Sequence, residues 1–380
     1  MNFPKRLEQR LADRQEQGNY RMLKQYPALS VDFFSNDYLG LSRSEAFQQQ
    51  LVNCAIQHPE TLCSSTGSRL ISGNTQVTEQ VEQYIAQKHQ VEAALLFNSG
   101  YQANLALFGN LLTSRDTVLV DEYIHRSIHD GCSVSKAKKW KFKHNDLTDL
   151  ERLLKQATGD VYIAVESLYS MDGDIAPLEK LIVLSTVYGA HLIVDEAHAI
   201  GVYGWGLLHQ NNKQQEVFAH LVTYGKAMGV HGAAILGSYQ LQSALVNFAS
   251  PFIYSTAPVS MSALSIREAY KYVEQNQEVV HCLHKLIEYY QQCLPLPFVA
   301  TNSPIQLIAL CYLTGVEQLL QELKQAQLNV CVIKAPTVAR GTERLRICLH
   351  SYNTTKQIDQ LIQLIIKYAN TNSTILCNRN

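Results

Sequence analysis

A single lysine stands out in a long stretch of the chain that has no other charge. Lys226 is the only charged residue between Glu216 and Arg267, and its neighbours are small or apolar. We expect such a lysine to be desolvated, which lowers the pKa of its amine and frees the amine as a nucleophile. Schiff-base formation with a carbonyl compound is the chemistry that suits it. The alternative is a lysine that extends from a loop into solvent.

A carboxylate and an imidazole follow another apolar run. Asp195 ends the run His191–Asp195, and His198 comes three residues later. Burying this carboxylate is costly unless a positive group pairs with it, and a protonated heterocyclic nitrogen would do so. His198 could then bond an oxygen substituent of the same ring. The alternatives are a helix-capping Asp and a magnesium-binding Asp, but the chain has no GxxxxGK[ST] loop to accompany a magnesium site.

Two further segments lie directly after predicted strands. Asn98-Ser99-Gly100-Tyr101 opens a helix, where backbone N–H groups could bind a phosphate, although an ordinary helix cap is the alternative. His125 follows the run Thr117–Asp121 and could stack on an aromatic cofactor or cap a helix. Both segments fall where α/β sheets place their ligand sites.

A pair of arginines near the end of the chain has the spacing of a strand. Arg344 and Arg346 would lie on one face of it. A bidentate arginine is the usual partner of a substrate carboxylate, and a solvated edge strand is the alternative.

Short aliphatic runs alternate with stretches of helical period over the first two thirds of the chain. Helical patterns at 102–112, 146–156 and 176–188 separate several of these runs. Such alternation predicts an α/β fold with a mostly parallel sheet and helices on both faces. The expected strands are Ala93–Phe97, Thr117–Asp121, Val161–Val165, His191–Asp195, His220–Tyr224 and Ala233–Leu236.

The last third of the chain predicts a smaller α+β unit. A long helical stretch over 261–292 precedes short strands near 306–310, 329–333 and 344–348, and a closing helix over 354–368. We therefore expect an N-terminal arm (1–35) that opens with a polar helix over 3–25, a large domain (36–260), a small domain (261–370) and a flexible tail (371–380).

The composition excludes several classes of protein. The 380 residues are 46% hydrophobic with a formal net charge of −1, so no electrostatic feature calls for nucleic acid or an anionic membrane. The uncharged stretch Ala227–Ile266 is interrupted by Pro251 and Pro258, which favours an interior or interface segment over a membrane span. The N-terminus is polar and contains acids, and the nine cysteines include no CxxC pair. We therefore expect reduced cysteines and a cytoplasmic protein.

Taken in order, these motifs resemble the α-oxoamine synthases, fold-type I enzymes that depend on pyridoxal 5'-phosphate (PLP). The resemblance extends from Ser35–Leu41 to Arg346 and includes the Ser-Met-Asp-Gly-Asp run at 170–174. It implies a large domain with a seven-stranded, mostly parallel sheet flanked by helices, and a smaller C-terminal domain.

The resemblance also implies a role for each matching residue at the cofactor. Lys226 would form the Schiff base with the cofactor aldehyde, Asp195 would pair with the ring nitrogen, and His198 would bond the ring oxygen. His125 would stack on the ring, and Ser170 would lie beside it. The groups implied at the phosphate are Gly100, Tyr101 and Thr223.

The substrate residues follow from the same resemblance. Arg346 would bind the amino-acid carboxylate, Asn36 and Thr337 would line the substrate cleft, and Arg21 would contact the acyl substrate. Members of the family are homodimers, which implies that Ser255 and Thr256 reach the phosphate held by the other subunit.

Within the family, the chain is most similar to the biotin-pathway members. They join L-alanine to a pimeloyl thioester of coenzyme A or of an acyl carrier protein, with loss of carbon dioxide and free thiol. The runner-up is a sister member that uses glycine, 2-amino-3-ketobutyrate ligase or 5-aminolevulinate synthase. An aminotransferase would need no thioester. A cofactor-sensing transcription regulator would need an added basic DNA-binding module, and the roughly 90 residues before the first expected strand of the sheet carry no net positive charge.

Overall fold

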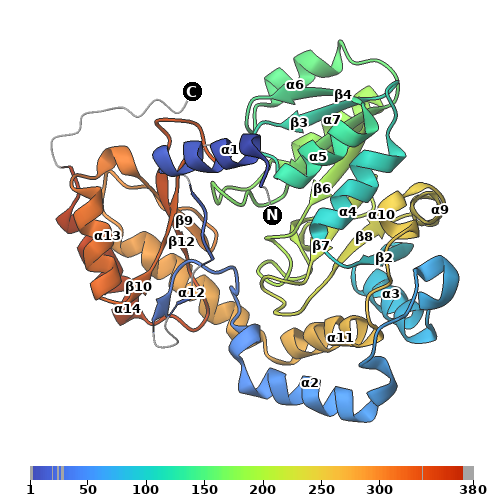
Figure 1. Cartoon of the computed structure of the whole chain (residues 1–380), viewed down its shortest axis with the longest axis horizontal. Helices are drawn as coiled ribbons and strands as arrows, with labels where there is room; N and C mark the ends of the chain where they lie inside the picture. Colours follow the sequence, from blue (N-terminus) through green and yellow to red (C-terminus); the bar gives the residue numbers. More distant parts are fainter. Residues whose placement is uncertain (1–2, 19, 24, 27–29, 336, 371–380) are drawn as a thin grey trace.

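The computed structural model describes residues 3–18, 20–23, 25–26, 30–335 and 337–370. Figure 1 shows two lobes: a larger one built on a central sheet, and a smaller one that contains most of the C-terminal third of the chain. The proposed tail over 371–380 lies outside the described residues.

The central sheet has seven strands in the order β2-β8-β7-β6-β5-β3-β4. Only β8 runs antiparallel to its neighbours, so the predicted mostly parallel sheet is confirmed. The strands are β2 (Ala93–Phe97), β3 (Thr117–Asp121), β4 (Lys138–Phe142), β5 (Val161–Glu166), β6 (His191–Asp195), β7 (Ala219–Thr223) and β8 (Ala233–Gly237).

The apolar runs form strands because both faces of the sheet are covered. Successive residues of one strand enter two different hydrophobic clusters: Leu192 and Val194 pack on one side of the sheet, and Ile193 packs on the other. A strand buried on both faces therefore reads as a continuous apolar run. The helices of this lobe are α2 (Glu45–Gln57), α3 (Gln76–Lys88), α4 (Gly100–Ala106), α5 (Arg126–Ser135), α6 (Leu147–Leu154), α7 (Leu178–Tyr188), α8 (Leu207–Gln210), α9 (Tyr239–Phe248), α10 (Ser250–Ile253) and α11 (Ser260–Gln275).

The sequence pattern missed strand β4. Three of its five residues are lysines, which hides the alternation that marks a strand. The strand lies at the edge of the sheet and pairs only with β3, so its lysines stay at the surface.

The smaller lobe has an antiparallel sheet in the order β11-β12-β9. The long helix expected over 261–292 is two helices, because the backbone leaves the helical conformation at Asn276. In Figure 1 this break lies where the chain passes from one lobe to the other. The elements are α12 (Gln277–Cys293), β9 (Ile305–Ala309), α13 (Val316–Gln325), β10 (Leu328–Asn329), β11 (Cys331–Ile333), β12 (Arg344–Cys348) and α14 (Thr355–Lys367).

The N-terminal segment forms part of this smaller lobe. Helix α1 (Lys5–Glu16) is shorter than the expected polar helix and buries none of its residues. The next segment adds strand β1 (Val31–Asp32) parallel to β10, and the Phe33 carbonyl accepts from the Cys348 N–H at 2.7 Å. Chain positions more than 300 residues apart are therefore held together.

The cysteines differ in part from the expectation that all are reduced. Seven of the nine cysteines carry free thiols, but Cys311 is disulfide-bonded; Cys377 lies outside the described residues.

The expectation that the uncharged stretch does not span a membrane concerns the helices. Among the helices of the described ranges, none combines the length and the apolar character needed to cross a bilayer.

Candidate active site

The polar residues singled out in the sequence gather at one edge of the central sheet. Asp195 ends β6, Thr223 ends β7 and Glu166 ends β5, and Glu166 is paired in register with Asp195. These strands are parallel, so their carboxyl ends lie together, where open α/β sheets bind ligands.

The Asp195 carboxylate is buried and has only neutral partners. Its Oδ2 accepts from the Asn104 side-chain amide at 3.0 Å, and its Oδ1 accepts from the Ala197 N–H at 3.0 Å. No cation forms an ion pair with it among the described residues. Because a buried carboxylate without a positive partner is costly, this position is suited to a cationic ligand group.

Asn104 connects Asp195 to the predicted histidine. Its amide also donates to Ser127 Oγ at 2.9 Å, and this hydroxyl lies 2.8 Å from His125 Nδ1. His125 caps α5, as the alternative interpretation allowed; the residue is solvent-exposed, and partial desolvation lowers the pKa of its ring. Sequence reasoning missed Asn104, whose one signal is an amide on the buried face of a helix.

Lys226 lies in a tight turn after β7. The Val230 N–H donates to the Tyr224 carbonyl at 2.9 Å and closes this turn. Burial lowers the pKa of the Lys226 amine, as the uncharged sequence predicts, while the charges of Asp195 and Glu166 act in the opposite direction. Lys226 is therefore within electrostatic reach of both carboxylates.

Glu166 is a further buried acid that the sequence did not single out. Its Oε2 accepts from the Ser170 N–H at 3.1 Å, and its Oε1 has no partner in the described structure. Burial, with the charge of Asp195, raises the pKa of Glu166 to about 8.

The turn before α4 lies beside the end of β7. Ser99 accepts from the Gln102 N–H and caps the helix. A Cβ added at Gly100 would lie 2.6 Å from Thr223 Cγ2, so this close approach requires glycine. The Asn98 amide donates to the Thr256 carbonyl at 3.2 Å, which brings the Ser255–Thr256 segment to the same turn. The side chain of Tyr101, next to Gly100, is exposed.

A second group of polar residues surrounds Arg346. This guanidinium is buried, and its Nε donates to the Ser170 carbonyl at 2.7 Å. Its Nη2 donates to Asn36 Oδ1 at 3.0 Å. Tyr38, which the sequence analysis did not single out, has its hydroxyl 2.7 Å from His198 Nδ1. The structure thus brings together Asn36, Ser170, His198 and Arg346.

Two predicted substrate residues lie apart from these contacts. Arg21 and Thr337 are exposed, and neither side chain forms a hydrogen bond or ion pair to the residues described above. Their assignment remains a prediction.

These groups fit a phosphorylated pyridine aldehyde. The turn at Gly100 opens helix α4 in close contact with Thr223, and the hydrogen-bond donors to the Asp195 carboxylate are neutral amides. Lys226 supplies an amine of lowered pKa. The donor set therefore matches the phosphate, the ring nitrogen and the aldehyde of such a molecule.

A model of the family described as aminotransferase class I and II matches residues 30–365. The chain belongs to this family. It is 35% identical to the 8-amino-7-oxononanoate synthase of Emericella nidulans, over 94% of each chain. It is 36% identical to the protein of the same name from Chromobacterium violaceum, over 89% of each chain.

Solved structures show the same architecture. The 8-amino-7-oxononanoate synthase of Francisella tularensis is 29% identical, with a TM-score of 0.76 over 90% of this chain and 98% of that chain. Serine palmitoyltransferase of S. paucimobilis, solved with a PLP–myriocin aldimine, is 22% identical, with a TM-score of 0.80 over 96% and 98% of the two chains. The fold-type I prediction is confirmed.

Proposed function

We propose that this protein is a PLP-dependent acyltransferase of biotin biosynthesis. It would condense L-alanine with a pimeloyl thioester to give 8-amino-7-oxononanoate, carbon dioxide and free thiol. The observation that carries the proposal is the arrangement at the edge of the sheet: Asp195 and Glu166 are paired in register at two strand ends, Lys226 follows the end of the next strand, and the Arg346 guanidinium bonds the carbonyl of Ser170, whose N–H bonds Glu166. It combines an amine nucleophile, acids and a carboxylate-binding group. The 8-amino-7-oxononanoate synthases among its relatives support the pathway.

The cofactor would be held by the groups at the edge of the sheet. Asp195 would pair with the ring nitrogen, His198 would bond the ring oxygen, and His125 would stack on the ring, with Ser170 beside it. The turn of Gly100 and Tyr101 would bind the phosphate together with Thr223. When bound, PLP withdraws electrons from the substrate Cα and so stabilises a carbanion there.

The chain's own residues would perform the proton transfers and the positioning. The Lys226 amine has a lowered pKa and would remove the proton from the substrate Cα and return it at the end. Asp195 would stabilise the positive charge of the ring nitrogen by pairing with it. Arg346 would bind the amino-acid carboxylate in the orientation that its bonds to Ser170 and Asn36 impose.

The remaining assignments belong to the same proposal. Asn36 and Thr337 would line the substrate cleft, and Arg21 would contact the acyl chain. We also propose a cytoplasmic homodimer in which Ser255 and Thr256 reach the phosphate bound by the other subunit. The thioester would come from coenzyme A or from an acyl carrier protein.

A matrix of substrates tests the reaction. L-alanine, glycine and L-serine are each offered with pimeloyl, acetyl and succinyl thioesters on coenzyme A and on a carrier protein, and the released thiol is measured. We expect thiol release to require L-alanine and the pimeloyl thioester. Release with glycine and an acetyl or succinyl thioester would instead indicate a sister synthase. Conversion of the cofactor to its amine form without any thioester would indicate an aminotransferase.

A further inference from the structure

Tyr38 joins the two lobes at the candidate site. Its hydroxyl lies 2.7 Å from His198 Nδ1 in the larger lobe. The same oxygen lies 3.2 Å from Asn36 Oδ1 and 3.5 Å from Arg346 Nη2, whose strand belongs to the smaller lobe. The Tyr38 side chain is fully buried, so these contacts are shielded from water.

We propose that Tyr38 is a positioning residue that fixes the tautomer of His198. The inference rests on the proposed function, because it assigns to His198 the bond to the cofactor's ring oxygen. A neutral imidazole carries one proton, and the bond made by one nitrogen decides whether the other donates or accepts. Donation from the Tyr38 hydroxyl to Nδ1 leaves the proton on Nε2, which can then donate to an oxygen.

The surroundings of His198 keep its ring neutral. Its ring is buried, and burial lowers its pKa well below the usual range, with the charges of Lys226, Arg346 and His125 acting in the same direction. A neutral ring is the state in which the tautomer matters.

The hydroxyl hydrogen has two acceptors within reach, Asn36 Oδ1 and His198 Nδ1. Asn36 Oδ1 already accepts from the Arg346 guanidinium at 3.0 Å, so it does not depend on Tyr38 for a donor. His198 Nδ1 has no other partner among the described residues, and its contact with Tyr38 is the shorter of the two. We therefore place the hydrogen on the bond to His198 rather than on the longer donation to Asn36 Oδ1.

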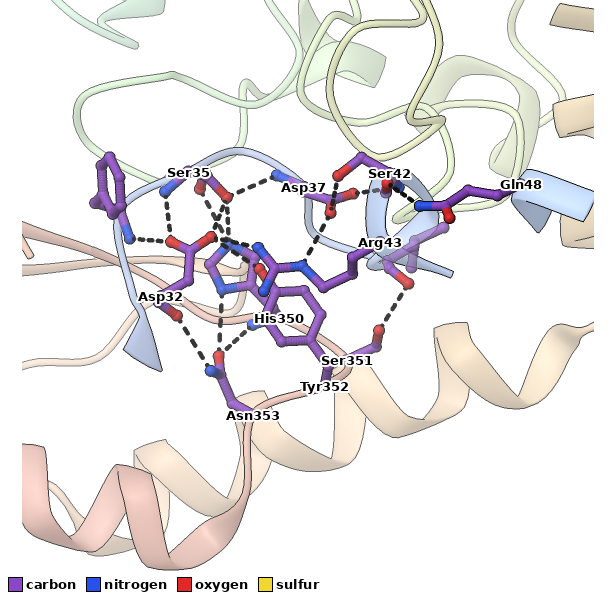
Figure 2. A network of polar contacts seen from close by, with 12 residues as sticks. Asp32, Ser35, Asp37, Ser42, Arg43, Gln48, His350, Ser351, Tyr352 and Asn353 are labelled. Carbon is purple, nitrogen blue, oxygen red and sulfur yellow. Dashed lines mark hydrogen bonds and ion pairs between the residues drawn. The ribbon is translucent and has the colours of Figure 1, made fainter. Parts of the chain in front are cut away.

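The backbone of Tyr38 is held by a network between the ends of the chain. We call the side chains of Asp32, Ser35, Arg43, His350 and Tyr352 the clasp; Figure 2 shows them converging. The Asp32 carboxylate accepts from the Ser35 N–H, from the Arg43 guanidinium and from the Tyr352 hydroxyl, at 2.9, 2.9 and 3.0 Å.

Ser351, which lies between His350 and Tyr352 of the clasp, holds the backbone of Tyr38 directly. The Ser351 N–H donates to the Tyr38 carbonyl at 2.9 Å, and the Ser351 hydroxyl donates to the Leu39 carbonyl at 2.8 Å. Tyr38 is thus held by hydrogen bonds from the smaller lobe and directly contacts His198 of the larger lobe.

The first test is made on the protein without cofactor, by NMR of the imidazole nitrogens. His198→Gln identifies the His198 signals. We expect wild-type His198 to be neutral with its proton on Nε2, and Tyr38→Phe to move a measurable share of the proton to Nδ1. A wild-type ring with its proton on Nδ1, or a tautomer that Tyr38→Phe leaves unchanged, would overturn the proposal. The wild-type spectrum shows which nitrogen of His198 carries the proton even if the Tyr38→Phe variant does not fold.

The second test uses the PLP-loaded protein. Tyr38→Phe should shift the pH at which the visible cofactor band titrates and weaken L-alanine binding roughly tenfold to a hundredfold, the range for losing one buried hydrogen bond. Tyr290→Phe is the matched control, because Tyr290 is fully buried and its hydroxyl has no partner in the described structure. An unchanged band and an unchanged alanine affinity in Tyr38→Phe would also refute the role.

The two tests separate this inference from the proposed function. If the wild-type protein forms no covalent adduct between PLP and Lys226, the proposed function fails, whereas the cofactor-free tautomer measurement still decides the Tyr38 contact. If the adduct forms and the tautomer does not depend on Tyr38, only the inference about Tyr38 fails.

Discussion

Arg346 donates to the Asn36 side-chain oxygen at 3.0 Å and has no carboxylate partner among the described residues. The neighbouring Arg344 differs, because it forms an ion pair with Asp172. An amide can orient a guanidinium without neutralising it, so the buried charge of Arg346 remains available to an anion. This difference between two arginines of one strand favours Arg346 over Arg344 as the proposed partner of the substrate carboxylate.

Replacing Arg346 with lysine should weaken amino-acid binding while leaving the cofactor in place. Lysine keeps the charge but loses the planar donors that reach Ser170 and Asn36. We expect the KM for L-alanine to rise roughly tenfold to a hundredfold, as for a lost hydrogen bond to a charged group. Steady-state kinetics measure the KM for L-alanine, and the visible absorbance band of the cofactor measures whether PLP stays bound. Arg340→Lys, at an exposed position, is the control, and an unchanged KM in Arg346→Lys would exclude the assignment.

Replacing Lys226 with alanine should abolish covalent cofactor binding. The amine of lowered pKa is the group proposed both to bind the aldehyde and to transfer the Cα proton. We expect activity to fall by about a thousandfold or more. Borohydride reduction followed by peptide mass analysis measures the covalent attachment. Lys285→Ala, at an exposed lysine, should behave as wild type, whereas an active Lys226→Ala protein with normal absorbance would contradict the mechanism.

Replacing Asp195 with asparagine should separate cofactor binding from catalysis. The side chain keeps its size but loses the charge that would hold a positive ring nitrogen. We expect some PLP to bind and turnover to fall by about a hundredfold to ten-thousandfold, the scale of losing one preorganised electrostatic group. Equilibrium binding of PLP and kcat are measured in parallel. Full turnover in the variant would mean that Asp195 has no part in stabilising charge on the ring.

The central sheet was readable from the sequence because burial on both faces produces unbroken apolar runs. Five of its seven strands begin at the expected residue, and β7 begins one residue earlier than expected. Strand β4 was not found, since lysines at the sheet edge carry no burial signal. The break at Asn276 was also missed, because both helices flanking it continue one amphipathic pattern.

The sequence revealed residues of the candidate site mainly where a residue of unusual type ends or follows a predicted strand. Asp195 and Lys226 were found because charge is conspicuous in apolar sequence. Asn104, Glu166 and Tyr38 were missed, since an amide on a helix, an acid ending a strand and a tyrosine in a turn are ordinary in sequence. Their importance arises from contacts between distant positions, such as the 2.7 Å contact of Tyr38 with His198.

Acid should destabilise the protein through a buried histidine outside the site. His220 is fully buried, with His89 at a ring-centroid distance of 5.7 Å, and neither His220 ring nitrogen has a partner in the described structure. Burial, with the charge of His209, lowers the pKa of His220 to about 3. The unfolded chain therefore binds more protons than the folded protein once the pH falls below about 6.5, and stability decreases from there toward pH 3.

The variant His220→Leu isolates this effect. At pH 5 the linkage amounts to about 2 kcal/mol, whereas at pH 8 it is close to zero. The free energy of unfolding of His220→Leu minus that of the wild type should therefore be larger, meaning a relatively more stable variant, at pH 5 than at pH 8 by about this amount. Denaturant unfolding at the two pH values measures it, with exposed His281→Leu as the control. If the stability difference between His220→Leu and the wild type does not depend on pH, His220 is not the source of the loss of stability in acid.

Replacing Gly40 with alanine should loosen the clasp and, through it, the substrate site. Gly40 has φ +72°, and an added Cβ would lie 2.7 Å from the ring of Tyr352, whose hydroxyl bonds Asp32. Left-handed strain alone costs about 1–2 kcal/mol, and the clash adds to it. Gly189→Ala is the matched control, because Gly189 has φ +61° and nothing within 4 Å. We expect Gly40→Ala to lose more stability than the control and to bind L-alanine more weakly, since the displaced turn carries Asn36 and Tyr38. Equal losses in both variants, with unchanged alanine affinity, would show that the clasp does not position the site.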